Sequence, residues 1–246
     1  MKYYLKFLFT AILTGTIFIL LPISSQAQMF SISDDEPGRR EGIYFYTMIG
    51  ASWELADFSY QGEGISDRER VDFNDSIIRL RLDSPGLDLS FAIGGTLTGM
   101  DDASFLNLNG RLYNGFPIAR AQNFLLMLPL QITSDLKQIR KNQSNAEFLQ
   151  SSLSIGTGLS TIFNLGDAVT LDIRSTPNYG FSFSQGSLFG GNLFKFDGKA
   201  LLHINNLFGS NALTLGYYFD YNRYRIEGDL NDYDYTSHSI TIGYAF

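Results

Sequence analysis

A strict alternation of apolar and polar residues constrains this chain most, recurring in short runs from about residue 43 to the end. Successive side chains of a β-strand point to opposite faces, so a period of two predicts strands with one apolar and one polar face. We predict ten strands, over residues 43–54, 76–83, 87–97, 106–116, 124–135, 149–163, 169–183, 194–205, 213–222 and 237–246.

The connections between these strands alternate in length. Mostly short turns follow the even strands, and longer polar loops follow the odd ones. This rhythm is typical of an antiparallel barrel that crosses a membrane. We therefore predict an all-β fold, a closed antiparallel transmembrane β-barrel of about ten strands. A different division of residues 56–75 would give eight or twelve, and Pro129 predicts a local irregularity because it cannot donate a ladder hydrogen bond.

The composition of the two faces indicates which one lines the interior. The polar face carries many small residues, such as Ser152, Gly156 and Gly180, which suit a crowded lumen. The apolar face is continuous and is expected to contact lipid. Aromatic residues lie near its strand ends, where interfacial girdles belong: Phe45, Trp53, Tyr179, Phe183, Phe194, Tyr221 and Phe246.

The first residues have the three parts of a secretory signal. Lys2 and Lys6 precede an apolar run over residues 7–23, and small residues end at Ala27. We expect cleavage after Ala27, with a membrane-anchoring helix as the alternative. Residues 1–27 are then the signal peptide, 28–41 a short periplasmic segment and 42–246 the barrel, with both ends of the barrel in the periplasm.

Charge and cysteine content exclude several classes of protein. Without the two lysines of the export segment the balance is 16 − 25 = −9, so charge argues against nucleic acid as a partner. The chain has no cysteine, which excludes disulfides, thiolate metal sites and acyl anchoring through a cysteine.

The last ten residues, SHSITIGYAF, place Ile240, Ile242, Tyr244 and the terminal Phe246 on one strand face. This ending resembles the C-terminal signature of bacterial outer-membrane β-barrel proteins. The resemblance implies that these four residues form an assembly signal, read by the barrel assembly machinery, and that the last strand pairs with the first. It also implies the outer membrane of a Gram-negative envelope, with outer-membrane lipid as a partner, and identifies no subfamily.

Two histidines limit the catalytic options. Membrane-barrel hydrolases of the phospholipase and lipid A deacylase kinds use a His-x-Ser pair, whose side chains share a strand face. The residues two positions after His203 and His238 are Asn205 and Ile240, so neither histidine fits. We expect no cofactor and no enzymatic activity, with a hydrolase at the rim as a remote alternative.

A barrel of ten strands is also similar to the barrel of the omptin proteases. These enzymes need an Asp-His pair and an acidic pair at the rim. Asp101 and Asp102 are adjacent, and Asp234 precedes His238 by four residues, but the omptin spacing is absent. Three acidic residues near the last loop lack the glycine and terminal glutamate of a calcium loop, so we expect no metal site there: Asp229, Asp232 and Asp234.

Charged residues recur on the face assigned to the lumen: Glu54, Arg79, Arg81, Asp83, Asp88, Arg111, Asp172, Arg174, Lys195, Asp197, Lys199 and Asp220. They form either a salt-bridged plug or the lining of a narrow pore. A plug is favoured because buried charges need partners and a barrel this narrow has little free space. A plug would pair opposite charges across the lumen, as in the set Arg79, Arg81, Arg111 and Arg174 with Asp83, Asp88, Asp172 and Asp220. A pore would keep basic and acidic ladders apart.

The predicted function is a small non-enzymatic outer-membrane barrel that serves envelope integrity or surface interaction through its long loops. The alternative is a porin-like channel for small solutes or ions. The first and last loops are acidic, and the third is expected to carry Lys137, Arg140 and Lys141. Their partner is not identified by the sequence.

Overall fold

The computed structural model describes residues 43, 45–61, 71–142, 146–184, 189–226 and 231–246. The chain divides into units 1–41 and 42–246, and only the second is described, so the predicted signal peptide and periplasmic segment lie outside the described residues, as does Asp229 of the acidic last loop. The strands are β1 (Met48–Tyr60), β2 (Phe73–Ser84), β3 (Leu87–Gly94), β4 (Ala103–Ala121), β5 (Phe124–Lys141), β6 (Glu147–Thr157), β7 (Leu159–Asn164), β8 (Val169–Phe183), β9 (Phe189–Phe208), β10 (Asn211–Arg225) and β11 (Tyr233–Ala245).

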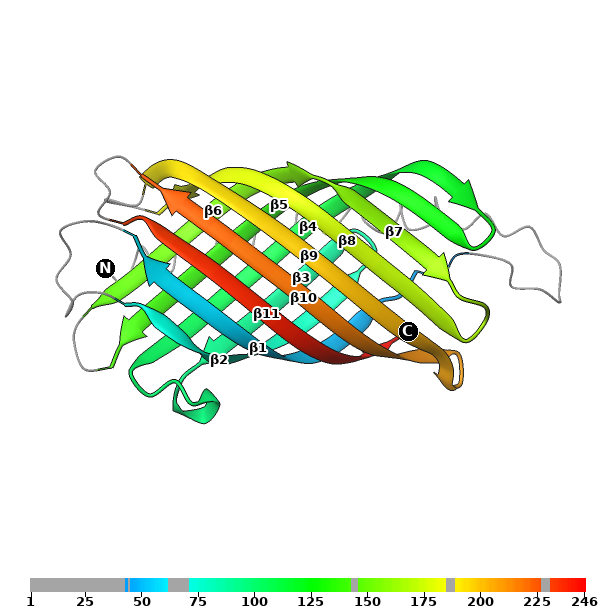
Figure 1. Cartoon of the computed structure of the whole chain (residues 1–246), viewed down its shortest axis with the longest axis horizontal. Coiled ribbons are helices and arrows are strands. Elements are labelled where there is room, and N and C mark those ends of the chain that lie inside the picture. The colour runs from blue at the N-terminus through cyan, green and yellow to red at the C-terminus, as the bar shows by residue number, and fades with distance from the viewer. Residues whose placement is uncertain (1–42, 44, 62–70, 143–145, 185–188, 227–230) are drawn as a thin grey trace, which may run out of the picture. The chain divides into compact units, whose positions relative to one another are not determined.

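These strands form one closed antiparallel sheet (Figure 1). β1 pairs with both β2 and β11, and the remaining gap is closed by pairing of β4 with β5. β6 and β7 continue one another, because both lie between β5 and β8. The barrel wall therefore has ten strand positions around its circumference, which we call staves, with β6 and β7 sharing one of them. This confirms the predicted closed barrel of about ten antiparallel strands. Each strand in the described part of the barrel therefore has a pairing partner on both sides, so the sheet has no edge strand.

The barrel has two distinct ends. We call the end with Met48 and Ala245 the terminal end, where β2–β3, β4–β5, β7–β8 and β9–β10 are joined by short turns. The opposite end, where β1, β3, β5, β8 and β10 end and β2, β4, β6, β9 and β11 begin, is the loop end. The turn between β2 and β3 requires Gly86, whose φ of 89° is in the left-handed region.

Several strands reach further toward the loop end than predicted. β1 continues to Tyr60 and β5 to Lys141, so segments assigned to loops are strand. The third predicted strand instead stops at Gly94, and Thr96–Thr98 form a 3₁₀ turn with Leu97 exposed. The longer strands have a common cause: alternation continues beyond the predicted ends, but the apolar residues change to the inner face.

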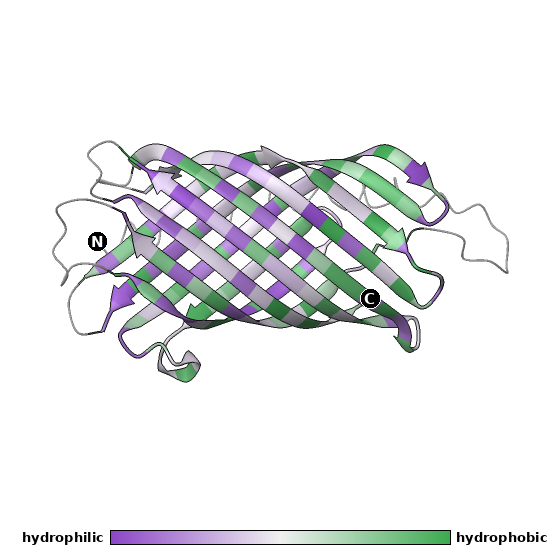
Figure 2. Ribbon diagram, in the orientation of Figure 1, coloured by the Kyte–Doolittle hydropathy of each residue, from purple (hydrophilic) through white to green (hydrophobic). Residues whose placement is uncertain are grey.

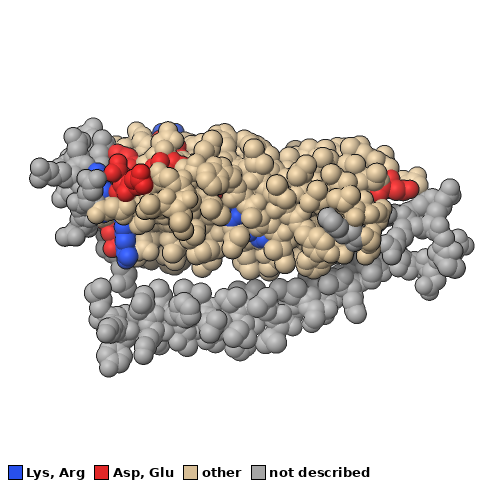
Figure 3. Space-filling view, turned by 90° about the horizontal axis from the view of Figure 1, so that it is seen from below, with Lys and Arg blue, Asp and Glu red and all other residues tan. Residues whose placement is uncertain are grey.

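Hydrophilic and hydrophobic residues alternate along the strands (Figure 2), and the exposed residues of the outer face are apolar over most of its length. On β1, Ile49, Trp53 and Leu55 are each about half exposed, and on β11 Ile240 is 71% exposed. Figure 3 shows that charged side chains on the visible face gather mainly toward the loop end. Among the described residues, no helix is long and apolar enough to cross a membrane.

Candidate functional site

The inner face of the barrel is filled by side chains of three chemical kinds, stacked along its axis. A charged layer occupies the middle. An aromatic layer fills the loop end, and a layer of small and uncharged polar residues lies at the terminal end.

The charged layer holds equal numbers of basic and acidic side chains among the described residues. Seven are basic and seven acidic: Arg79, Arg81, Arg111, Lys137, Arg174, Lys195 and Lys199, with Glu54, Asp83, Asp88, Asp135, Asp172, Asp197 and Asp220. Because burial in low dielectric is costly for an isolated charge, such a balance is what a filled lumen requires.

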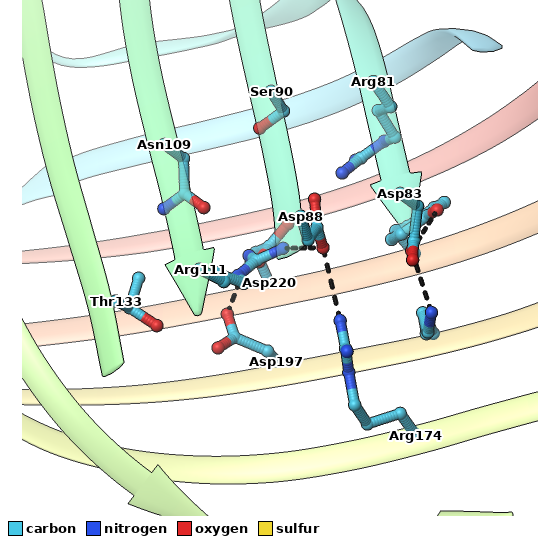
Figure 4. Close-up of polar contacts among 12 residues, drawn as sticks. Arg81, Asp83, Asp88, Ser90, Asn109, Arg111, Thr133, Arg174, Asp197 and Asp220 are labelled. Atoms are coloured by element: carbon cyan, nitrogen blue, oxygen red, sulfur yellow. Dashed lines mark hydrogen bonds and ion pairs between the residues drawn. The ribbon is translucent and has the colours of Figure 1, made fainter. Parts of the chain in front are cut away.

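Arg111 of β4 is the hub of this layer (Figure 4). Its Nη1 donates to Asp88 on β3 at 3.1 Å, and its Nη2 donates to Asp197 on β9 at 3.0 Å and Asp220 on β10 at 2.6 Å. The planar guanidinium, with five N–H donors, can serve several carboxylates at once, which an ammonium does less well. One arginine therefore joins β4 to staves on the opposite side of the barrel.

A second cluster is built around Glu54 of β1. Arg79 donates to both carboxylate oxygens, at 2.6 and 2.9 Å, and Tyr235 donates its hydroxyl at 2.9 Å. Arg81 Nη2 lies 3.8 Å from the same carboxylate, and its guanidinium lies over the ring of Tyr218, 3.7 Å from the centroid. Glu54 is completely buried, so the bidentate pair supplies hydrogen bonds that water cannot.

Two further cations, Lys199 and Arg174, also link strands across the lumen. Lys199 of β9 lies 2.8 Å from Asp83 on β2 and 3.0 Å from Asp172 on β8. Arg174 of β8 donates to Asp88 on β3 at 3.2 Å. The basic and acidic groups interdigitate rather than forming separate ladders.

The structure differs from the predicted charge network in two respects: which residues pair with each other, and which residues belong to the network. Arg79 and Arg81 meet Glu54, rather than one of the four aspartates assigned to the arginine set. Asp135 and Lys137 were missed: Lys137, predicted in the third loop, is a buried luminal residue of β5. The alternation of Asp135, Lys137 and Ile139 was the signal that could have placed it.

The ammonium group of Lys137 has both an acidic and an aromatic neighbour. Its Nζ lies 3.9 Å from Asp135 and 4.2 Å from the ring centroid of Tyr235. Asp135 also accepts hydrogen bonds from Asn107 at 2.7 Å and Asn109 at 3.1 Å. Beside these residues a small cavity has room for about one water molecule. The layer is thus filled almost completely by its own side chains.

The aromatic layer closes the loop end. Nine strands contribute to the cluster, as do Val71 and Met100, which lie outside the strands. Its members are Ala56, Phe58, Tyr60, Val71, Phe73, Ile77, Ala92, Met100, Ala103, Phe105, Ile139, Phe148, Leu193, Tyr224, Tyr233 and Tyr235. Phe58 is central, with ring centroids 4.9 Å from Tyr233 and 5.1 Å from Phe148. The hydroxyl of Tyr233 donates to Gln150, so its buried polar atom is satisfied.

The outer wall changes character at the level of the aromatic layer. Asp57 and Asn74 flank the inward Phe58 and Phe73 and are exposed, as is Arg223. Two outer ion pairs join neighbouring strands there, Arg140–Glu147 at 3.1 Å and Arg225–Asp234 at 3.0 Å. The loop-end part is therefore polar outside and apolar inside, whereas the middle is apolar outside and charged inside.

The two histidines lie on opposite faces of the wall. His203 is buried in the terminal layer, with Nδ1 2.8 Å from Thr214 Oγ1 and its ring 4.7 Å from that of Tyr46. His238 is exposed on the outer face, with Nδ1 2.7 Å from the Tyr217 hydroxyl. Asp234 is paired with Arg225. Among the described residues no group of three or more His, Asp or Glu side chains is arranged to hold a metal ion.

No known family matches the sequence, and no curated protein matches it. Similar solved structures include Ail, the attachment invasion locus protein of Yersinia pestis, at 11% identity and TM-score 0.28, covering 83% of this chain and 100% of that one. The outer-membrane protease OmpT of Escherichia coli is 9% identical at TM-score 0.34, covering 82% and 95%. The β domain of the Bordetella autotransporter BrkA is 12% identical at TM-score 0.30, covering 80% and 98%. Values this low carry no information on activity, ligand or partner.

Proposed function

We propose that the chain is a non-enzymatic outer-membrane barrel with a closed lumen, which holds its loops on a rigid platform outside the bilayer for surface interaction or envelope integrity. The observation that carries this proposal is the reversal of polarity along the barrel. The part with an apolar outer wall suits lipid, and the part with a polar outer wall and an aromatic interior suits water.

The apolar belt has the height that a bilayer demands. On β9 the outward residues are apolar or glycine from Phe194 to Ile204. Ten residue steps of about 3.3 Å, tilted by about 40°, span about 25 Å, the usual height of such a band. Beyond it the outward side chains include Asp57, Arg140 and Arg223, which favour the aqueous side.

The filled lumen supports a structural or interaction role over transport. Arg111, Lys199 and Arg174 link opposite sides of the barrel, and the aromatic layer lies above them in the same lumen. An ion would have to break buried pairs to pass, at a cost of several kcal/mol per uncompensated charge. The loop-end platform instead fixes the strand ends from which the loops leave.

The absence of enzymatic activity is part of the same proposal. His203 already contacts Thr214 and Tyr46 inside the barrel, and His238 lies outside. A general base must share a reaction site with its nucleophile or orienting carboxylate, and these two histidines are separated by the wall.

Planar-bilayer recording of the refolded barrel tests the closed lumen. We expect no steady current, because both interior layers are filled. Steady ohmic openings would contradict the proposal and establish the channel alternative. Heat-dependent migration on a gel identifies folded protein and serves as the control.

Outer-membrane assembly is tested through the terminal residue. Backbone bonds join Phe246 to Thr47, at 2.9 and 3.0 Å, so the last residue is anchored beside the start of β1. Replacing Phe246 with Asp should reduce the outer-membrane fraction and leave protein in the periplasm, since the aromatic anchor and the proposed assembly signal are lost. An unchanged outer-membrane fraction would contradict that role.

A further inference from the structure

The barrel wall is interrupted where β6 ends and β7 begins. Pairing of β5 stops at Leu130–Thr157 and resumes at Met127–Ser160, and pairing of β8 is interrupted between Asn178–Gly156 and Ser175–Leu159. Two register positions are therefore missing on both sides of one stave. No other stave in the described part of the barrel is divided in this way.

Two prolines adjoin this interruption, one from each neighbouring strand. The register that continues across it places Pro129 of β5 opposite Gly158 and Pro177 of β8 opposite Thr157. Neither proline has an N–H, so each removes a ladder donor from this point of the wall. The prediction of an irregularity at Pro129 is confirmed, and its largest effect is on the neighbouring stave.

Three inward positions at the interruption have no side chain. Glycine occupies the inward positions 156, 158 and 180, and a Cβ at Gly158 would lie only 1.9 Å from the carbonyl oxygen of Ser175. The backbones of β8 and of the divided stave therefore approach each other here more closely than side chains at these three positions would allow. Outward neighbours are apolar and exposed, including Leu128, Leu159 and Tyr179.

Three unpartnered polar atoms lie on the luminal face beside this interruption. Gln131 Oε1, Ser154 Oγ and Thr176 Oγ1 are buried and have no hydrogen-bond partner within the described part of the chain. Gln131 and Thr176 are both 0% exposed, and the Gln131 amide nitrogen is already used by Asp197 at 2.9 Å. An amide oxygen can only accept, so the missing partner of Gln131 is a hydrogen-bond donor.

We propose that this seam, formed by Pro129, Thr157, Gly158 and Pro177, opens laterally and admits an uncharged amphipathic molecule with a hydroxyl donor from the membrane to Gln131 and Thr176. A neutral head fits because the charged layer behind the seam is already balanced, and an apolar tail fits the belt outside it. The inference rests on the membrane placement proposed above.

Cysteine labelling tests the seam cleanly, because the chain has no cysteine of its own. Thr176→Cys places a thiol behind the seam, and Thr241→Cys is the matched control, at a 0% exposed luminal threonine between intact ladders. In refolded barrels in phosphatidylcholine vesicles, a bilayer-partitioning N-alkylmaleimide should label the Thr176→Cys variant at least about tenfold faster than the Thr241→Cys variant. Equal rates, or equally fast labelling of the Thr176→Cys variant by a charged water-soluble maleimide, would overturn the lateral route.

The chemistry of the ligand is tested in the same vesicles. Decan-1-ol should slow labelling of the Thr176→Cys variant, whereas its methyl ether, which has no donor, should not. Equal protection by both compounds would overturn the donor assignment. Heat-dependent migration and protection of the strands from protease establish insertion first, so loss of insertion would count against the membrane placement rather than the seam. If Thr176→Cys does not fold, Ser154→Cys replaces it with the same expected order of rates.

Discussion

The loop-end part and the middle of this barrel have opposite polarity on their inner and outer faces. At the loop end, Phe58 and Phe148 pack inside while Asp57 and Glu147 face out, as in a water-soluble barrel. In the middle, Trp53 and Leu55 face out while Glu54 is buried with Arg79. One continuous strand, β1, belongs to both parts and changes polarity between Leu55 and Ala56.

This difference shows that a period of two defines a strand but not which face is apolar. The apolar layer is held by non-directional burial, in which neighbouring side chains can adjust. The charged layer is held by directional ion pairs. Removal of one member leaves its partners buried, with neither an opposite charge nor water to stabilise them. The two layers should therefore respond differently to substitution.

The largest expected effect comes from the charged layer. Replacing Arg111 with Met leaves Asp88, Asp197 and Asp220 without their shared partner, and should lower the free energy of unfolding by about 3–5 kcal/mol. Guanidinium titration of the barrel in vesicles measures the change. Arg223→Met, on the exposed outer wall, is the control and should stay within about 0.5 kcal/mol. A loss below about 1 kcal/mol for Arg111→Met would show that the layer is not held by its hub.

The boundary between the layers is tested at Tyr235, whose ring belongs to the aromatic layer and whose hydroxyl binds Glu54. Tyr235→Phe keeps the ring and removes the donor to a buried carboxylate, so stability should fall by about 1.5 kcal/mol. Combined with Arg79→Met, the effect should be non-additive because both residues serve Glu54. If the losses of stability from the two substitutions are additive, Tyr235 and Arg79 stabilise the barrel independently, which would contradict this link between the layers.

The smallest effect is expected within the aromatic layer. Phe58→Leu retains an apolar side chain among Tyr233 and Phe148, and should cost about 1 kcal/mol as the neighbours adjust. The same titration measures it. A loss as large as that of Arg111→Met would mean that the aromatic packing is as exacting as the ion pairs.

The sequence predicted the barrel because alternation and turn rhythm are local properties that survive without tertiary context. It did not predict the aromatic layer: Phe58, Tyr60 and Phe73 fell in the predicted first loop. The polarity change at Ala56 made the alternation look broken, although the strand continues.

The charged face was predictable for a similar reason, but its partners were not. Most of the luminal charges follow from strand parity, which is set within each strand. The contact of Arg174 with Asp88 joins residues separated by 86 positions and depends on the curvature of the closed sheet. Lys137 was missed because the fifth strand was predicted to end at residue 135, two residues before it. The first strand was likewise predicted to end too early, at residue 54.

The central claim, that two chemically different layers close the lumen in series, is tested most directly by planar-bilayer conductance. Arg111→Ala with Asp220→Ala empties part of the charged layer without changing net charge, and Phe58→Ala with Phe148→Ala and Tyr233→Ala trims the aromatic layer. We expect each set alone to remain silent and the combined variant to conduct steadily, provided that all three migrate as folded barrels. Conductance from either set alone, or silence of the folded combined variant, would contradict closure by two layers.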